Sequence, residues 1–145
     1  MKTIKNLTLL MGLCAVVLLA VGCDKESTGY DVYENHDISV CGIDDPLQNI
    51  EWLSEYCKIL KEMQNFSSTY IYLYKVIGTD EPLFQTVISY SEFDDSPVAQ
   101  STSWENSTGK TVFATNSGMP PMPGVVEEFF KDKEFVVELF HLIKK

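Results

Sequence analysis

An alternating run near the middle of the chain constrains the fold more than any other feature. Residues 68–77 are Ser-Thr-Tyr-Ile-Tyr-Leu-Tyr-Lys-Val-Ile, so that tyrosines and aliphatic residues take turns. Successive side chains of a β-strand point to opposite faces of the sheet. The run therefore predicts a strand with Tyr70, Tyr72 and Tyr74 on one face and aliphatic side chains on the other.

Further segments are predicted to pair with this strand. A turn-forming Gly-Thr-Asp-Glu-Pro sequence separates it from a second β-rich run at residues 83–90, which predicts an antiparallel hairpin. A third strand is predicted at residues 111–115, after a Thr-Gly turn. The intervening residues 91–110 are rich in Ser, Asp, Asn and Thr, and are predicted to form a loop that holds one weak strand.

Helices are predicted on both sides of these strands in the sequence. Asp44 and Asp45 precede Pro46, which is a favourable helix start, and apolar residues recur every three or four positions up to residue 63. A wide apolar stripe predicts a second helix over residues 125–144. The expected fold class is α+β, with an N-terminal helix, an antiparallel sheet of three or four strands, and a C-terminal helix packed on one sheet face.

The start of the chain has the composition of an export signal. Lys2 and Lys5 precede an apolar run of about 15 residues, shorter than the roughly 20 residues that a membrane-spanning helix needs. The small residues before Cys23 resemble the lipobox of bacterial lipoproteins, although Ala20 and Val21 depart from the usual Leu and Ala or Ser. A plain signal peptide with an incidental thiol at Cys23 is the alternative.

The lipobox resemblance implies a division of the chain and a location. Residues 1–22 would be removed as a signal peptide, and Cys23 would carry the lipid that anchors the protein. An acidic tether over residues 23–39 would then lead to a single compact domain over residues 40–145. The expected location is the bacterial cell envelope, at the outer membrane, with the lipid anchor as the contact to the membrane.

The charge of the chain excludes some classes of partner. The formal net charge is −10, and loss of the two signal-segment lysines makes the mature chain more acidic still. The sequence contains no arginine. Phosphate recognition needs a basic patch, so nucleic-acid binding is not expected. Direct adhesion to anionic lipid headgroups is not expected for the same reason.

One short segment is similar to a known group of proteins. Residues 41–53 are Cys-Gly-Ile-Asp-Asp-Pro-Leu-Gln-Asn-Ile-Glu-Trp-Leu. This segment resembles a Cys-Gly-x-x-Asp-Pro-Leu-x-Asn-x-x-Trp-Leu motif that follows the lipobox in small, uncharacterised lipoproteins of the Bacteroidota. The resemblance covers the signal and residues 41–53, and it implies an envelope lipoprotein with a compact domain. It implies no activity.

Two cysteines remain in the domain once Cys14 and Cys23 are set aside. A disulfide between Cys41 and Cys57 would close a loop of about 15 residues and contribute roughly 3 kcal/mol in an oxidising compartment. Two free thiols are an equally weighted alternative, because Cys57 falls on the apolar face of the predicted helix. Two cysteines without paired histidines lack the ligands for a zinc site.

The sequence has no recognisable catalytic pattern. His36 and His141 have no evident nucleophile or metal partner, and no serine lies in a Gly-x-Ser-x-Gly or Ser-x-x-Lys motif. The acidic stretches at residues 44–45 and 91–95 lack the Asp-x-Asp-x-Asp-Gly pattern of a calcium loop. We therefore expect no enzyme activity, no cofactor and no metal.

The expected function is a non-enzymatic binding module of the envelope. Tyr70, Tyr72 and Tyr74 are its predicted binding face, because an exposed row of tyrosines is a favourable platform for a protein or glycan ligand. Packing of the tyrosines against neighbouring elements is the structural alternative. The alternative function is an inhibitor of a secreted protease or hydrolase that presents the loop at residues 91–110.

Overall fold

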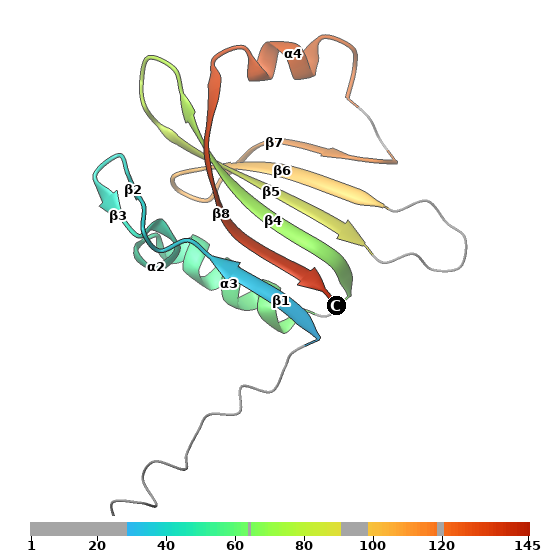
Figure 1. The fold of residues 1–145 in the computed structure, drawn as a ribbon. Helices are drawn as coiled ribbons and strands as arrows, with labels where there is room; N and C mark the ends of the chain where they lie inside the picture. Colours follow the sequence, from blue (N-terminus) through green and yellow to red (C-terminus); the bar gives the residue numbers. More distant parts are fainter. Residues whose placement is uncertain (1–28, 64, 91–98, 119–120) are drawn as a thin grey trace, which may run out of the picture.

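A six-stranded antiparallel sheet dominates the fold (Figure 1). The computed structural model describes residues 29–63, 65–90, 99–118 and 121–145. The strand order is β1-β8-β4-β5-β6-β7. These strands are β1 (Tyr30–Glu34), β4 (Phe66–Val76), β5 (Pro82–Tyr90), β6 (Gln100–Asn106), β7 (Thr111–Asn116) and β8 (Lys133–Lys144). The remaining elements are the β2–β3 hairpin (Ser39–Val40 and Ile43–Asp44), α2 (Pro46–Asn49), α3 (Glu51–Glu62) and α4 (Val125–Phe130).

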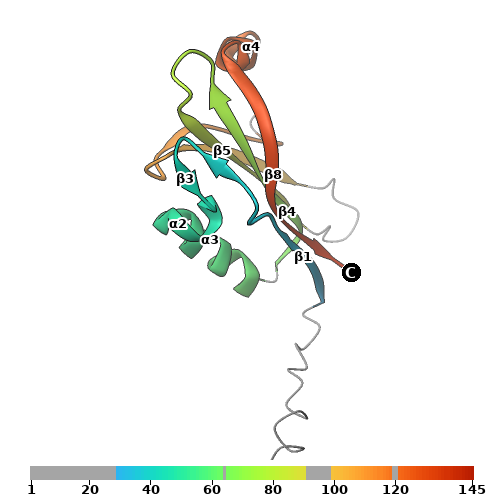
Figure 2. The ribbon, with the colours of Figure 1, turned by 60° about the vertical axis from the view of Figure 1, so that its left-hand side comes forward.

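The main core lies between α3 and one face of this sheet, as Figures 1 and 2 show. Leu53, Cys57 and Leu60 recur at spacings of four and three residues, so they share the buried face of α3. Alternate residues of the central strands meet them from the sheet. The fully buried sheet residues of this core include Phe66, Ile71, Leu73, Phe84, Leu139 and Phe140. The predicted aliphatic face of β4 is therefore the face that the helix covers.

The predicted α+β fold class is wrong. The C-terminal segment, expected to be a helix packed on the sheet, instead forms the interior strand β8 between β1 and β4. Only the six residues of α4 are helical in this part of the chain. The protein is mostly β, with a larger sheet than expected and short helices.

Two β-bulges explain why β8 has a helix-like sequence. The register between β4 and β8 shifts twice, and at each shift β8 contributes one extra residue. Phe135, Glu138 and His141 consequently lie opposite the three tyrosines of β4, although they are three positions apart instead of two. A spacing of three is typical of a helix. The bulges thus conceal a strand that its β-branched and aromatic content favours.

The segment before β4 fits the prediction more closely. A helix begins at Pro46 as expected, but the extended backbone of Ile50 divides it into α2 and α3. Cys41 and Gly42 form the two-residue turn between β2 and β3, and both have positive φ angles, of 51° and 78°. Such angles are characteristic of a type I′ turn. The Cys-Gly and Pro-Leu parts of the motif at residues 41–53 thus form a hairpin turn and a helix start.

One segment that was expected outside the sheet belongs to it, and another forms a fuller strand than expected. Tyr30–Glu34 lies in the predicted acidic tether, yet it forms β1 and pairs with β8 over its full length. Residues 100–106 lie in the segment that was predicted to be a loop with one weak strand, and they form the seven-residue β6 between β5 and β7. The β4–β5 hairpin and β7 are strands, as predicted.

Candidate functional site

The sheet face opposite α3, called the open face below, carries a band of aromatic side chains. Strand alternation places them there, because each lies next in sequence to residues that face the helix. We call this band the aromatic stripe, and it consists of Tyr33, Tyr70, Tyr72, Tyr74, Trp104, Phe113, Phe135 and His141. Five strands contribute to it: β1, β8, β4, β6 and β7. The stripe therefore crosses the sheet from one edge to the other.

The three predicted tyrosines form the centre of the stripe. The rings of Tyr70 and Tyr72 are nearly parallel, with centroids 5.8 Å apart. Phe135 of β8 contacts Tyr72 and Tyr74 edge-on, with centroid distances of 6.2 and 5.5 Å. All three tyrosines are partly exposed, so they both pack on neighbours and contribute surface. Burial raises the pKa of Tyr72 and Tyr74 above the ordinary value, and the Glu138 carboxylate adds to the increase at Tyr72.

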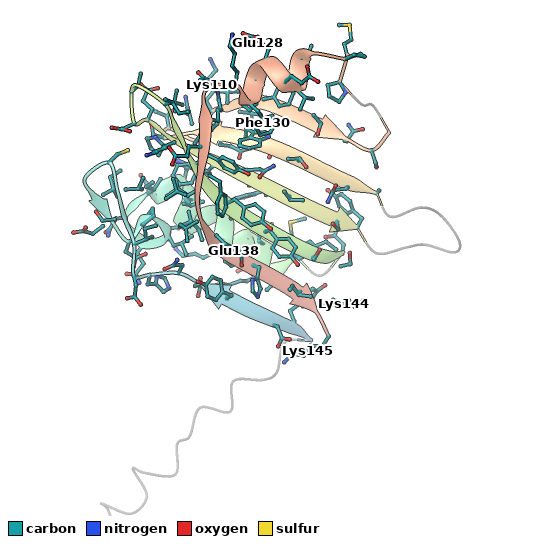
Figure 3. The ribbon with its side chains drawn as sticks, turned by 45° about the horizontal axis from the view of Figure 1, so that its top comes forward. Lys110, Glu128, Phe130, Glu138, Lys144 and Lys145 are labelled. Atoms are coloured by element: carbon teal, nitrogen blue, oxygen red, sulfur yellow. The ribbon has the colours of Figure 1, made fainter. Side chains whose placement is uncertain are left out.

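One end of the stripe is covered by α4 (Figure 3). Trp104 is only 1% exposed, and it lies edge-on to Tyr74 on one side and to Phe129 and Phe130 of α4 on the other. Phe113 of β7 stacks on Phe129 at 4.4 Å. This packing fixes the tryptophan end of the stripe and leaves its centre uncovered by α4.

The other end of the stripe is built around His141. Its ring lies between those of Tyr33 and Tyr70, at centroid distances of 5.1 and 5.8 Å. The three residues are direct cross-strand neighbours on β1, β8 and β4. The Nδ1 atom of His141 lies 2.6 Å from Oε1 of Glu138. The carboxylate therefore orients the imidazole on the open face.

Large apolar surface is exposed along the stripe. Phe135 is 54% exposed although it lies between two tyrosines, and Tyr33 is 41% exposed. The tyrosines were predictable from their alternation. Phe135 and His141 were not, because their strand has a helix-like spacing. The aromatic side chains of α4 were assigned to a helix, but nothing in the sequence placed that helix over Trp104.

The two domain cysteines are free thiols in the structure. Cys57 is buried in the core, and burial raises the pKa of its thiol to about 12, with the nearby Glu34 carboxylate adding to the increase. Cys41 is exposed in the β2–β3 turn, where its thiol donates to the carbonyl oxygen of Asp80. His36 lies in the same region, with Nδ1 2.9 Å from the carboxylate of Asp45.

Several sequence-based expectations concern residues outside the described ranges. They are the signal peptide over residues 1–22, lipidation of Cys23, and the acidic stretch at residues 91–95. The inhibitor hypothesis depends on a long loop at residues 91–110. Because β6 takes up residues 100–106, that loop is shorter than the hypothesis assumed, and residues 91–98 also lie outside the described ranges.

Neither a metal-binding cluster nor a membrane-spanning helix is present among the described residues. Among these residues, no group of three or more His, Cys, Asp or Glu side chains is arranged to hold a metal ion. No helix formed by them is both long enough and apolar enough to cross a membrane.

The chain was also compared with known proteins. No protein-family model, no curated protein and no solved structure matches it.

Proposed function

We propose that the protein is a non-enzymatic binding module of the bacterial cell envelope, anchored by lipid on Cys23, and that its open face binds a protein partner. The observation that carries the proposal is the aromatic stripe, which lies on the sheet face that α3 leaves uncovered. Contiguous exposed apolar surface is uncommon on monomeric proteins unless it binds something.

The composition of the stripe favours a protein partner. Tyrosine, tryptophan and phenylalanine are enriched in protein interfaces, because each buries much area while losing few rotatable bonds. Phe135 provides an exposed apolar anchor at the centre, and its neighbours Tyr72 and Tyr74 are partly exposed residues whose hydroxyls can form hydrogen bonds. One end of the stripe is held in place, because Trp104 is buried between Tyr74 and the aromatic side chains of α4. An aromatic anchor on a rigid support loses little entropy on binding.

Affinity capture with matched variants tests this proposal. Residues 24–145 contain every described element, so this fragment serves as bait for envelope extracts. Phe135→Ala should weaken capture of a specific protein by about tenfold or more, the typical effect of removing an aromatic anchor. Val112→Ala is the control, because Val112 is 46% exposed on β7 but lies outside the stripe. It should leave the capture unchanged.

Two outcomes would overturn the protein-partner proposal. If Phe135→Ala captures the same protein as the unmodified bait, the open face is not the binding surface. Retention of binding material that survives proteolysis but is lost on glycosidase treatment would identify a glycan ligand instead. Circular dichroism of each variant excludes unfolding as the cause of a lost interaction.

A further inference from the structure

A pocket of about 420 Å³ lies on the other side of the sheet, between α3 and the β6–β7 hairpin. Helix α3 contributes Trp52, Glu55, Tyr56 and Ile59, and the hairpin contributes Glu105 and Thr111. The volume is in the range of small-molecule sites. Two carboxyl groups and two aromatic rings line the pocket, and none of its lining residues is basic.

Glu105 is the unusual residue of this pocket. Its side chain projects to the α3 side of the sheet, and the residue is only 9% exposed. The Oε2 atom has no hydrogen-bond partner among the residues that the structure describes. Burying an unpaired carboxyl oxygen is costly, and such groups are rare in folded proteins. Glu105 also lines the pocket, so the pocket wall includes a buried carboxyl group with one oxygen that lacks a partner among the described residues.

The surroundings of Glu105 raise the pKa of its carboxyl group above the ordinary value. Burial raises its pKa, while hydrogen bonding by Ser103 and Thr86 lowers it by a smaller amount. The other ionisable groups at the pocket are Glu55 and Tyr56 of α3, and Tyr90 of β5 interacts with Tyr56. Glu55 itself is exposed and paired with Lys58 at 2.7 Å.

The wall of the pocket is held in place by Trp52. Its indole Nε1 donates to the carbonyl oxygen of Ser107 at 3.0 Å, and its ring lies edge-on to the buried Phe84 at 5.4 Å. The β6–β7 turn is thereby fastened to α3. The aromatic wall and the buried carboxyl group thus keep a fixed relation to each other.

We propose that this pocket binds an aliphatic primary ammonium group, as found in free alkyl amines and in lysine side chains. The ammonium would donate to the carboxylate of Glu105 and interact with the face of an aromatic ring, while the aliphatic stem packs on Trp52 and Ile59. The absence of basic side chains from the lining and the net charge of −10 both favour a cation over an anion.

The proposal predicts how binding depends on pH. An ammonium ion favours the ionised carboxylate, so binding to protonated Glu105 must release a proton. Affinity should therefore rise as the pH increases through the raised pKa of Glu105 and then level off while the amine stays charged. A neutral ligand would show no such increase.

Calorimetric titration of the purified protein with two amines tests the proposal. The first probe is 1,5-diaminopentane, a free amine, and the second is Nα-acetyl-lysine N-methylamide, a lysine side chain on a neutral backbone. Binding of the first alone assigns the site to free amines, binding of the second alone assigns it to lysine side chains, and binding of both establishes the shared chemistry. Pentanol is the uncharged control and should bind much more weakly than either amine.

Matched variants connect the binding to Glu105. Glu105→Gln should weaken amine binding by about tenfold or more and abolish its pH dependence. Glu128→Gln removes the same charge from α4, on the opposite side of the sheet (Figure 3), and should have no effect. Thr111→Arg places a competing cation at the exposed edge of the pocket and should also abolish binding, even if Glu105→Gln fails to fold.

Three results would overturn the proposal: no binding of either amine at millimolar concentration, equal affinity for pentanol, or full affinity in Thr111→Arg. The site lies on the opposite sheet face from the aromatic stripe, so Phe135→Ala should leave amine binding intact. Failure of the open-face proposal and failure of this one are therefore distinguishable.

Discussion

Gly109 lies at the junction between α3 and the β6–β7 hairpin, where the structure leaves no room for a side chain. Its φ angle is +80°, and a Cβ atom built on it would lie 2.8 Å from Cγ of Trp52. The residue therefore needs both the left-handed conformation and the missing side chain. Asn106 fixes the same turn, because its Oδ1 accepts from the backbone nitrogens of Thr108 and Lys110, each at 3.0 Å.

We predict that Gly109→Ala lowers the free energy of unfolding by about 2–4 kcal/mol, the sum of backbone strain and overpacking against Trp52. Gly78→Ala is the matched control, because Gly78 also has a positive φ, of 96°, but nothing lies within 4 Å of its added Cβ. Its loss should be limited to strain, about 1–2 kcal/mol. Denaturant unfolding measures both values, and equal losses would show that the contact with Trp52 does not restrict residue 109.

At the level of elements, a strand could be predicted from the sequence only where its alternation of side chains is regular. The alternation in residues 68–77 predicted the β4–β5 hairpin and the shared face of Tyr70, Tyr72 and Tyr74, because β4 keeps an unbroken period of two from Thr69 to Tyr74 against β5. The bulged β8 has no such period, and its spacing of three predicted a helix. The open face therefore could be anticipated on β4 but not on its neighbour β8.

The acidic composition of β1 and the polar composition of β6 also made these strands hard to predict from the sequence. β1 contains Asp31 and Glu34, and it lies at the edge of the sheet, where charged side chains can stay in contact with water. β6 is rich in Ser and Thr, and this composition predicted only a weak strand within a loop. Both segments form strands because they pair with neighbouring strands, and such pairing cannot be seen in the local sequence pattern.

Hydrogen exchange distinguishes the observed C-terminal strand from the helix that its sequence suggests. Amides of β8 that pair with β1 and β4 should be among the most protected in the protein, because β8 is an interior strand with the fully buried Leu139 and Phe140. Those of α4 should exchange quickly, because none of its residues is fully buried. Equal protection across residues 125–144 would contradict the strand and indicate one continuous helix.

At the scale of the whole molecule, the two ends of the described chain meet at one corner of the sheet. The backbone nitrogen of Lys145 donates to the carbonyl oxygen of Gly29 at 2.9 Å, and β1 pairs with the end of β8 (Figure 1). The α4 end of the molecule lies at the opposite edge. A membrane anchor that precedes residue 29 would therefore attach at the β1 corner, and both proposed binding surfaces are on the faces of the sheet instead of at that corner.

The acidic body offers no attraction to an anionic membrane surface, so lipid on Cys23 would supply the whole of the membrane affinity. We therefore predict that cells fed labelled palmitate incorporate the label into the protein, and that Cys23→Ser abolishes incorporation. Cys41→Ser is the matched control, because Cys41 is also an exposed thiol but lies within the domain, and it should keep both the label and the membrane fraction. Mass spectrometry of the N-terminal peptide provides the independent measurement. An intact leader, or an unmodified sulfur at position 23 in the exported protein, would refute lipid anchoring while leaving the fold and both sheet faces as described.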